Sequence, residues 1–262
     1  MTPFSTLVAA IALSTDGYTV TLPDDWLQGR TAYGGLSAAL CYEAASRAFT
    51  DLPPLRSAQF CFIGPAGGTV TIVPTILRQG RSTVFVSVDL MAESGLAARA
   101  LLSFGAARES AFDYSDLAMP AVAAPEQCES FFGGRPGPSF AKHFDSRLAG
   151  GFRPITGAPE PDMLLWLRHF DEATPNDLTA LIALADAAPP AAMTQFTTPA
   201  PISTMTWSID MLAPAPADDS GWRLMRTTAE STMAGYSAQA MMIWGPGGEP
   251  LMVARQNVAI FA

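Results

Sequence analysis

The chain has 262 residues, of which 49% are hydrophobic and 15% charged, and its formal net charge is −9. This composition can bury a large core, and the negative charge argues against a nucleic-acid partner, which needs a basic face. No apolar run approaches about 18 residues, so no membrane span is expected. The 3 cysteines are widely spaced without metal-site spacing and cannot all pair. They therefore predict reduced thiols, no metal site and a cytoplasmic protein.

The first half reads as a helix followed by a sheet. Residues 18–27 alternate weakly and predict a strand. Gly34 and Gly35 then open a helix of about four turns, with Leu36 and Leu40 on one apolar face. Four segments rich in Val and Thr follow and predict an antiparallel meander: SAQFCFI, TVTIVPTILRQ, STVFVSVDLMA and LAARALLSFGA.

The second half repeats this order after a segment rich in proline and glycine. Two strand-like stretches, FAKHFDSRLAGGFRP and MLLWLRHF, come first. A helix capped by Thr174 or Asn176 should then run to Ala188, and four more strands follow. The predicted division is a first unit at 1–110, a linker at 111–139 and a second unit at 140–262.

Each unit alone would leave one sheet edge and one sheet face exposed. Joining the two sheets into one, with both helices on its concave side, would cover both. The sequence therefore predicts an α+β fold built from two similar halves. An edge that remains exposed would allow further pairing into a homo-oligomer.

An overlay of the two halves shows where they differ in chemistry. The strands were aligned on the prolines that end them, Pro65 and Pro214, and on the last strand of each half. Apolar residues of the first half then face hydrogen-bonding residues of the second, which points to function in the second half. The pairs are Leu55 with Thr204, and Leu101 with Gln256.

Four segments in order, YGGLSAAL, RSAQFCFIGPA, ILRQGRS and GGEPLMVARQNVAIF, resemble the acyl-CoA thioesterase II family over nearly the whole chain. The resemblance implies a double hot-dog fold, in which two antiparallel sheets each wrap a central helix and join into one extended sheet. It also implies hydrolysis of acyl-CoA to a fatty acid and coenzyme A, without metal or organic cofactor. The chain departs from the family at Leu36-Ser37-Ala38, where a Gln is frequent, and in a short proline-rich loop before Thr204.

The resemblance assigns the attacking water to Asp186, Thr204 and Gln256. Asp186 would accept a proton as water attacks the thioester, and partial burial that raises its pKa would suit a general base. The alternatives are a solvent-facing Asp at a helix end, an ordinary strand threonine and a satisfied core amide. A period of two predicts that Thr204 shares its strand face with Thr206, Ser208 and Asp210.

Two further pairs of residues are candidates for binding the substrate. The helix start at Gly34-Gly35 could offer a free N–H to the oxyanion, with Gly35 favoured, or it could simply form a tight turn. Arg78 and Arg81 could contact the phosphates of coenzyme A, against an unfavourable overall charge, or could form surface ion pairs.

Two other functions remain open at this point. A non-catalytic protein that binds acyl-CoA or an acyl carrier would suit the apolar composition equally well. A hot-dog hydratase or dehydratase would need an Asp–His pair near a helix start, and neither His143 nor His169 is so placed.

Overall fold

The computed structural model describes residues 1–213 and 220–261. Pro214, which guided the overlay above, lies outside the described residues. Elements of the first half, with 3₁₀ helices marked η, are α1 (Phe4–Ala9), β1 (Ala12–Ser14), β2 (Gly17–Thr21), η1 (Asp24–Trp26), β3 (Leu27–Gln28), β4 (Thr31–Ala32), α2 (Gly34–Ala48), β5 (Leu55–Phe62), β6 (Thr69–Gln79), β7 (Thr83–Ala92) and β8 (Gly95–Gly105). Those of the second half are η2 (Pro125–Gln127), β9 (Glu129–Ser130), η3 (Ser139–His143), β10 (Phe144–Gly151), β11 (Asp162–His169), α3 (Leu178–Leu184), η4 (Ala191–Gln195), β12 (Ile202–Met211), β13 (Arg223–Met233), β14 (Tyr236–Trp244) and β15 (Pro250–Ile260).

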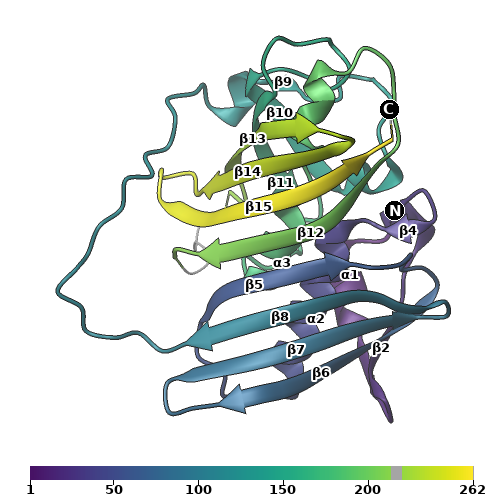
Figure 1. Ribbon diagram of the computed structural model, residues 1–262, viewed down its shortest axis with the longest axis vertical. Helices are drawn as coiled ribbons and strands as arrows, with labels where there is room; N and C mark the ends of the chain where they lie inside the picture. The colour runs from purple at the N-terminus through teal and green to yellow at the C-terminus, as the bar shows by residue number, and fades with distance from the viewer. Residues whose placement is uncertain (214–219, 262) are drawn as a thin grey trace.

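One sheet of 13 strands runs through both halves in the order β1-β2-β6-β7-β8-β5-β12-β15-β14-β13-β11-β10-β9 (Figure 1). The halves have matching topologies, because β5 lies beside β8 as β12 lies beside β15. The predicted four-strand meander is therefore wrong in one detail: β5 does not pair with β6, since it adds to the far side of β8.

The halves join through antiparallel pairing of β5 with β12. On the inner face, Phe60 pairs with Trp207, and their rings stack with centroids 5.4 Å apart. Both side chains are 1% exposed, so this contact lies within the core. The expectation of one continuous sheet is confirmed.

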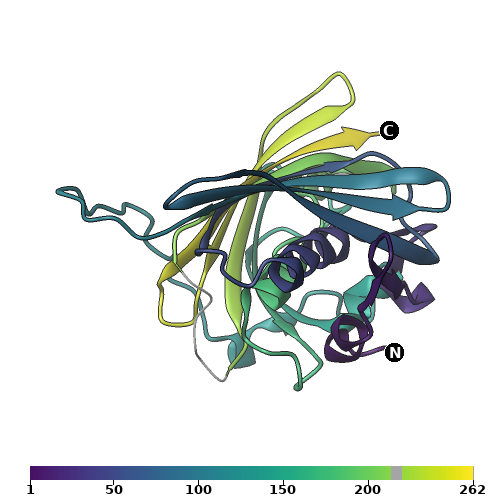
Figure 2. The ribbon, with the colours of Figure 1, turned by 90° about the horizontal axis from the view of Figure 1, so that it is seen from below.

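Helix α2 lies in the hollow of the curved sheet, and α3 packs beside it (Figure 2). Leu36 and Leu40 are 0% exposed, as the apolar face of the predicted helix requires. The concave face of the sheet therefore carries both helices, and the apolar core fills the space between them and the sheet.

The second helix is shorter than the sequence predicted. Its N-cap is Asp177, whose carboxylate accepts a hydrogen bond from Ala180 N at 2.9 Å, so neither Thr174 nor Asn176 caps it. The helix ends at Leu184 rather than Ala188, because the next turn tightens: Ala187 N donates to Leu184 O at 3.0 Å.

Residues 106–124, which overlap the predicted linker at 111–139, form no helix or strand. The following segment belongs to the second half, because β9 pairs with β10 at the sheet edge. Among the described residues, no helix is long and apolar enough to cross a membrane. All three cysteines are unpaired: Cys61 is exposed, while Cys41 and Cys128 are buried.

Candidate active site

Asp186 and Gln256 meet on the concave side of the sheet. Asp186 stands two residues beyond the end of α3, and Gln256 points inward from β15. The Gln256 amide donates a hydrogen bond from Nε2 to Asp186 Oδ1. Because Gln256 is only 7% exposed, its amide needs such a partner. Two of the three residues assigned to the water are thus in direct contact.

The start of α2 approaches the same carboxylate. The backbone N–H of Gly35 hydrogen-bonds to Asp186. A Cβ on Gly34 would lie 2.7 Å from Asp186 Oδ2 and 3.0 Å from Phe62 Cζ, and a Cβ on Gly35 would lie 2.6 Å from the carbonyl oxygen of Ala183. Both glycines are therefore required by the close approach of α2 to the turn that carries Asp186.

The pKa of Asp186 is strongly raised. Burial raises its pKa from 3.8 to about 7, and the hydrogen bonds from Gln256 and Gly35 oppose this rise only in part. A carboxylate with a pKa near neutrality exchanges protons readily at physiological pH. It has the property expected of a general base.

Thr204 faces inward because of a β-bulge. Thr204 pairs with Val258, whereas Thr206 pairs with Asn257, so Met205 is an extra residue in β12. Val258 is 0% exposed, and directly opposed residues of an antiparallel pair point to the same face. The prediction that Thr204 shares a face with Thr206, Ser208 and Asp210 is wrong, since a period of two assumes a regular strand.

The hydroxyl of Thr204 makes no hydrogen bond to Asp186 or Gln256 among the described residues. Gln256 pairs with Trp207, while Thr204 pairs with Val258, two positions further along β15. Thr204 and Gln256 are therefore diagonal neighbours on one face of the sheet.

The first half carries the same bulge. In β5, Leu55 pairs with Phe104 and Ser57 with Ser103, so Arg56 is the extra residue. Matching the two bulges puts Leu55 at the register position of Thr204, in agreement with the sequence overlay.

The other pair of the sequence overlay, Leu101 with Gln256, is wrong by one residue. Gln256 pairs with Trp207 across the bulged strand, and the equivalent pair in the first half is Leu102 with Ala58. Leu102 is 0% exposed on the inner face, whereas Leu101 points to the outer face. A shift of one residue in a strand reverses the face, so the match of Leu101 with Gln256 is wrong.

The carboxylate on the helix of the first half, Glu43, already has two hydrogen-bond donors. Glu43 lies on α2, ten residues after its N-cap Tyr33, whereas Asp186 stands nine residues after the N-cap Asp177, so the two acids do not occupy equivalent positions. Glu43 Oε1 accepts from Arg47 Nε at 2.7 Å, and Oε2 accepts from Thr179 Oγ1 at 2.6 Å. Sequence reasoning missed this pair, although Glu and Arg four residues apart on a helix are a recognisable signal.

Arg78 and Arg81 are exposed. They stand at the end of β6, whereas Thr204 stands near the start of β12, which runs parallel to β6 within the sheet. Four strands, β7, β8, β5 and β12, lie between β6 and β15, the strand that carries Gln256. The structure does not bring these arginines to the other site residues.

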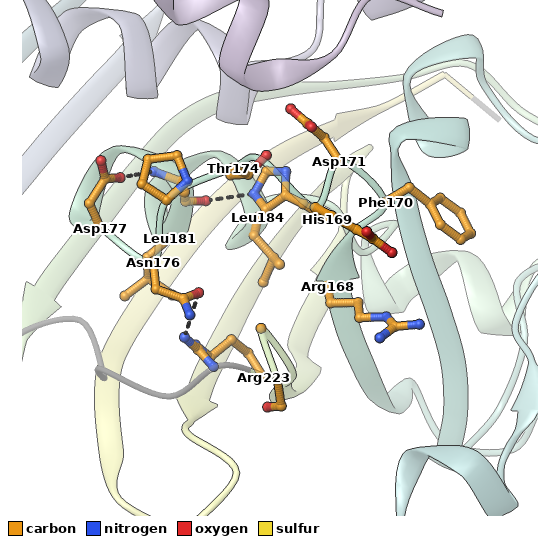
Figure 3. Close-up of a pocket in the computed structure, with 15 residues that line it drawn as sticks. Arg168, His169, Phe170, Asp171, Thr174, Asn176, Asp177, Leu181, Leu184 and Arg223 are labelled. Atoms are coloured by element: carbon orange, nitrogen blue, oxygen red, sulfur yellow. Dashed lines mark hydrogen bonds between the residues drawn. The ribbon is translucent and has the colours of Figure 1, made fainter.

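A cavity of about 500 Å³ lies beside α3, between β11 and the start of β13 (Figure 3). In it, His169 Nε2 donates to Ala180 O at 3.0 Å and Arg223 donates to Asn176 Oδ1 at 3.3 Å. Burial lowers the pKa of His169 to about 4, so its ring is neutral. None of Asp186, Thr204 and Gln256 lines this cavity.

An antiparallel sheet wrapped around one helix, given twice in one chain, defines a double hot-dog protein, and solved structures bear this out. A conserved protein with a hot-dog fold from Alicyclobacillus acidocaldarius superposes with a TM-score of 0.88 at 23% identity, covering 98% of this chain and 97% of the other. A putative thioesterase II from Thermobifida fusca gives 0.84 at 19% identity, covering 100% and 98%. An acyl-CoA thioesterase II from Mycobacterium marinum gives 0.75 at 20% identity, covering 98% and 97%.

Family models match both halves. Residues 22–105 match the acyl-CoA thioesterase N-terminal domain, and residues 122–260 match the acyl-CoA thioesterase C-terminal domain. A comparison with curated proteins gave no match. The chain belongs to the acyl-CoA thioesterase family, and its reaction class is thioester hydrolysis.

Proposed function

We propose that this chain hydrolyses acyl-CoA thioesters with a water molecule held and activated by Asp186, Thr204 and Gln256. The observation that carries the proposal is the contact of a partly buried carboxylate, its pKa near 7, with both Gln256 and the start of α2. This combination supplies a base beside a backbone N–H donor, which is what addition of water to a carbonyl needs.

In the proposed reaction, the water oxygen attacks the thioester carbon while Asp186 removes one of its protons. The carbonyl π electrons move onto the oxygen to give a tetrahedral intermediate. When the carbonyl re-forms, the carbon–sulfur bond breaks, and coenzyme A leaves as a thiolate that takes up the proton. Thr204 and Gln256 orient the water through the hydroxyl and the amide.

In this proposal the first turn of α2 stabilises the oxyanion. The N–H groups at the start of a helix have no partner within it, and the helix dipole favours negative charge there. The Gly35 N–H is bonded to the ionised Asp186. As Asp186 gains a proton its hold on this N–H weakens, so the donor becomes available when the oxyanion forms. One such donor is worth about 10²–10³ in rate.

We also propose a cytoplasmic location, because free thiols and a coenzyme A substrate suit a reducing compartment. The hydratase alternative is not favoured, although His143 Nε2 lies 3.5 Å from Asp25 Oδ2. His143 stacks on Trp26 with ring centroids 3.8 Å apart, and His169 bonds to Ala180 O, so neither forms a pair with Asp186.

Thiol release from acyl-CoA thioesters of increasing chain length tests the proposal. We expect steady release of coenzyme A, measured with DTNB, for at least one chain length. Calorimetric titration of the same compounds provides the control. Tight binding of an acyl-CoA without thiol release would show a binding protein instead.

The rate should depend on pH through Asp186. Because the base must be ionised, kcat should fall about tenfold per pH unit below about pH 7 and level off above it. Loss of thioester ultraviolet absorbance measures this without a thiol reagent. A flat profile from about pH 5 to pH 9 would contradict a base of raised pKa.

A further inference from the structure

A buried tyrosine links the two helices beside Asp186. Tyr33 is the residue before α2 and is 1% exposed. Its hydroxyl donates a hydrogen bond to the carbonyl oxygen of Ala183, in the last turn of α3. The ring lies flat on Phe140, with centroids 4.2 Å apart and planes 6° from parallel, and meets Phe144 edge-on. Residues of the second half thus hold in place a ring that the first half contributes.

The carbonyl that Tyr33 binds has lost its helical partner. In a continuing α-helix, Ala183 O would accept from the N–H of Ala187. Here Ala187 N donates to Leu184 O instead, because the last turn is tightened. Carbonyls at a helix end must find other donors, and the Tyr33 hydroxyl supplies one. The tyrosine therefore holds the turn in which Asp186 lies three residues further on.

The same turn packs directly against the start of α2. A Cβ on Gly35 would lie 2.6 Å from both Ala183 O and the Tyr33 hydroxyl oxygen. The N–H of Gly35 also reaches Asp186. A shift of the Ala183 carbonyl would therefore change the distance between Asp186 and its backbone donor.

We propose that Tyr33 is a positioning residue of the thioesterase site: through Ala183 O it sets the place of Asp186 relative to Gln256 and Gly35. The proposal rests on the proposed function of Asp186. Tyr33 itself does not touch the reacting atoms. Burial, with the nearby Asp186 carboxylate, raises the pKa of the Tyr33 hydroxyl well above 10, so the hydroxyl stays a donor throughout the working pH range.

The change Tyr33→Phe removes the donor and keeps the ring. We expect kcat to fall about 10- to 100-fold with little change in KM, since small misplacements of a reacting group have effects of this size. The bonds from Gln256 and Gly35 lower the pKa of Asp186, so weakening them should move the acid limb of the kcat–pH profile to higher pH. Tyr42→Phe, which removes a hydroxyl from a half-buried tyrosine on α2, is the matched control and should leave the limb in place.

A change that only destabilised the fold would lower the amount of active enzyme without moving the limb. If the acid limb of the kcat–pH profile and kcat itself are the same in Tyr33→Phe as in the parent, the positioning role is overturned. The variant Asp186→Asn tests the proposed function separately. If it keeps full activity, Asp186 is not the base, whatever the result for Tyr33→Phe. If Tyr33→Phe does not fold, fluorotyrosine at position 33 keeps the ring and strengthens the donor, and the limb should move to lower pH. No movement with that residue would also overturn the inference.

Discussion

Replacing Asp186 with Asn should lower kcat for acyl-CoA hydrolysis by about 10²–10⁴-fold, the usual worth of a general base. The amide keeps the size of the side chain and can still accept from Gln256 Nε2, but it cannot take the proton of the attacking water. Thiol release in the presence of DTNB measures the loss. Retention of the parent rate in this variant would refute the assigned role.

The same variant should be more stable than the parent at alkaline pH. The folded state raises the pKa of Asp186 from 3.8 to about 7, so ionising this carboxyl costs stability as the pH rises through that interval. Asn carries no charge, and at about pH 8 it should gain about 2 kcal/mol, after allowance for partial exposure. At about pH 4 the gain should vanish, because the parent is then protonated when folded. Thermal unfolding at both pH values measures the difference and also shows that the inactive variant is folded.

The change Gly34→Ala should reduce kcat by about 10²-fold, while most of the stability remains. The added Cβ would lie 2.7 Å from Asp186 Oδ2, so the carboxylate must move away from its place at the helix start. A shift of this kind disturbs the base and the backbone donors together. Gly80→Ala is the matched control, because its nearest neighbour, the carbonyl oxygen of Thr83, would be 3.4 Å away.

A contrasting result is expected one residue further on. A Cβ on Gly35 would lie 2.6 Å from the carbonyl of Ala183, which is backbone and cannot rotate away. Gly35→Ala should therefore lower the unfolding temperature clearly, whereas Gly34→Ala should lower it much less. Equal activity in Gly34→Ala and the parent would mean that the close contact with Asp186 does not matter for catalysis.

Much of this architecture could be predicted from local patterns. The paired glycines and the apolar face of the following helix identified α2, and the Val- and Thr-rich segments identified β5 to β8 of the first half. The strand predicted at 18–27 was too long, because β2 ends at Thr21 and the 3₁₀ helix η1 follows. The repeat of the order in the two halves then predicted one joined sheet, because neither half could cover its own edge. These signals are local, and tertiary contacts reinforce them.

Other features depend on contacts that no local pattern contains. The bulge at Met205 turns Thr204 inward, and a regular period of two cannot reveal an extra residue. The match of Leu101 with Gln256 failed by one residue for a related reason, since alignment by sequence length does not fix register. Tyr33 was missed because its partner, Ala183 O, is a backbone group far away in the sequence.

The two halves share one site, and one covalent chain keeps them paired. The start of α2 lies against Asp186, which the second half contributes, so neither half alone contains a complete site. In the first half the carboxylate on α2, Glu43, pairs with Arg47 instead, so the two halves are unlike each other. Separate unlike subunits would have to find each other and avoid pairing with their own kind. The connection through residues 106–124 replaces that bimolecular search with a high effective concentration, and it fixes the ratio of the two halves at one to one.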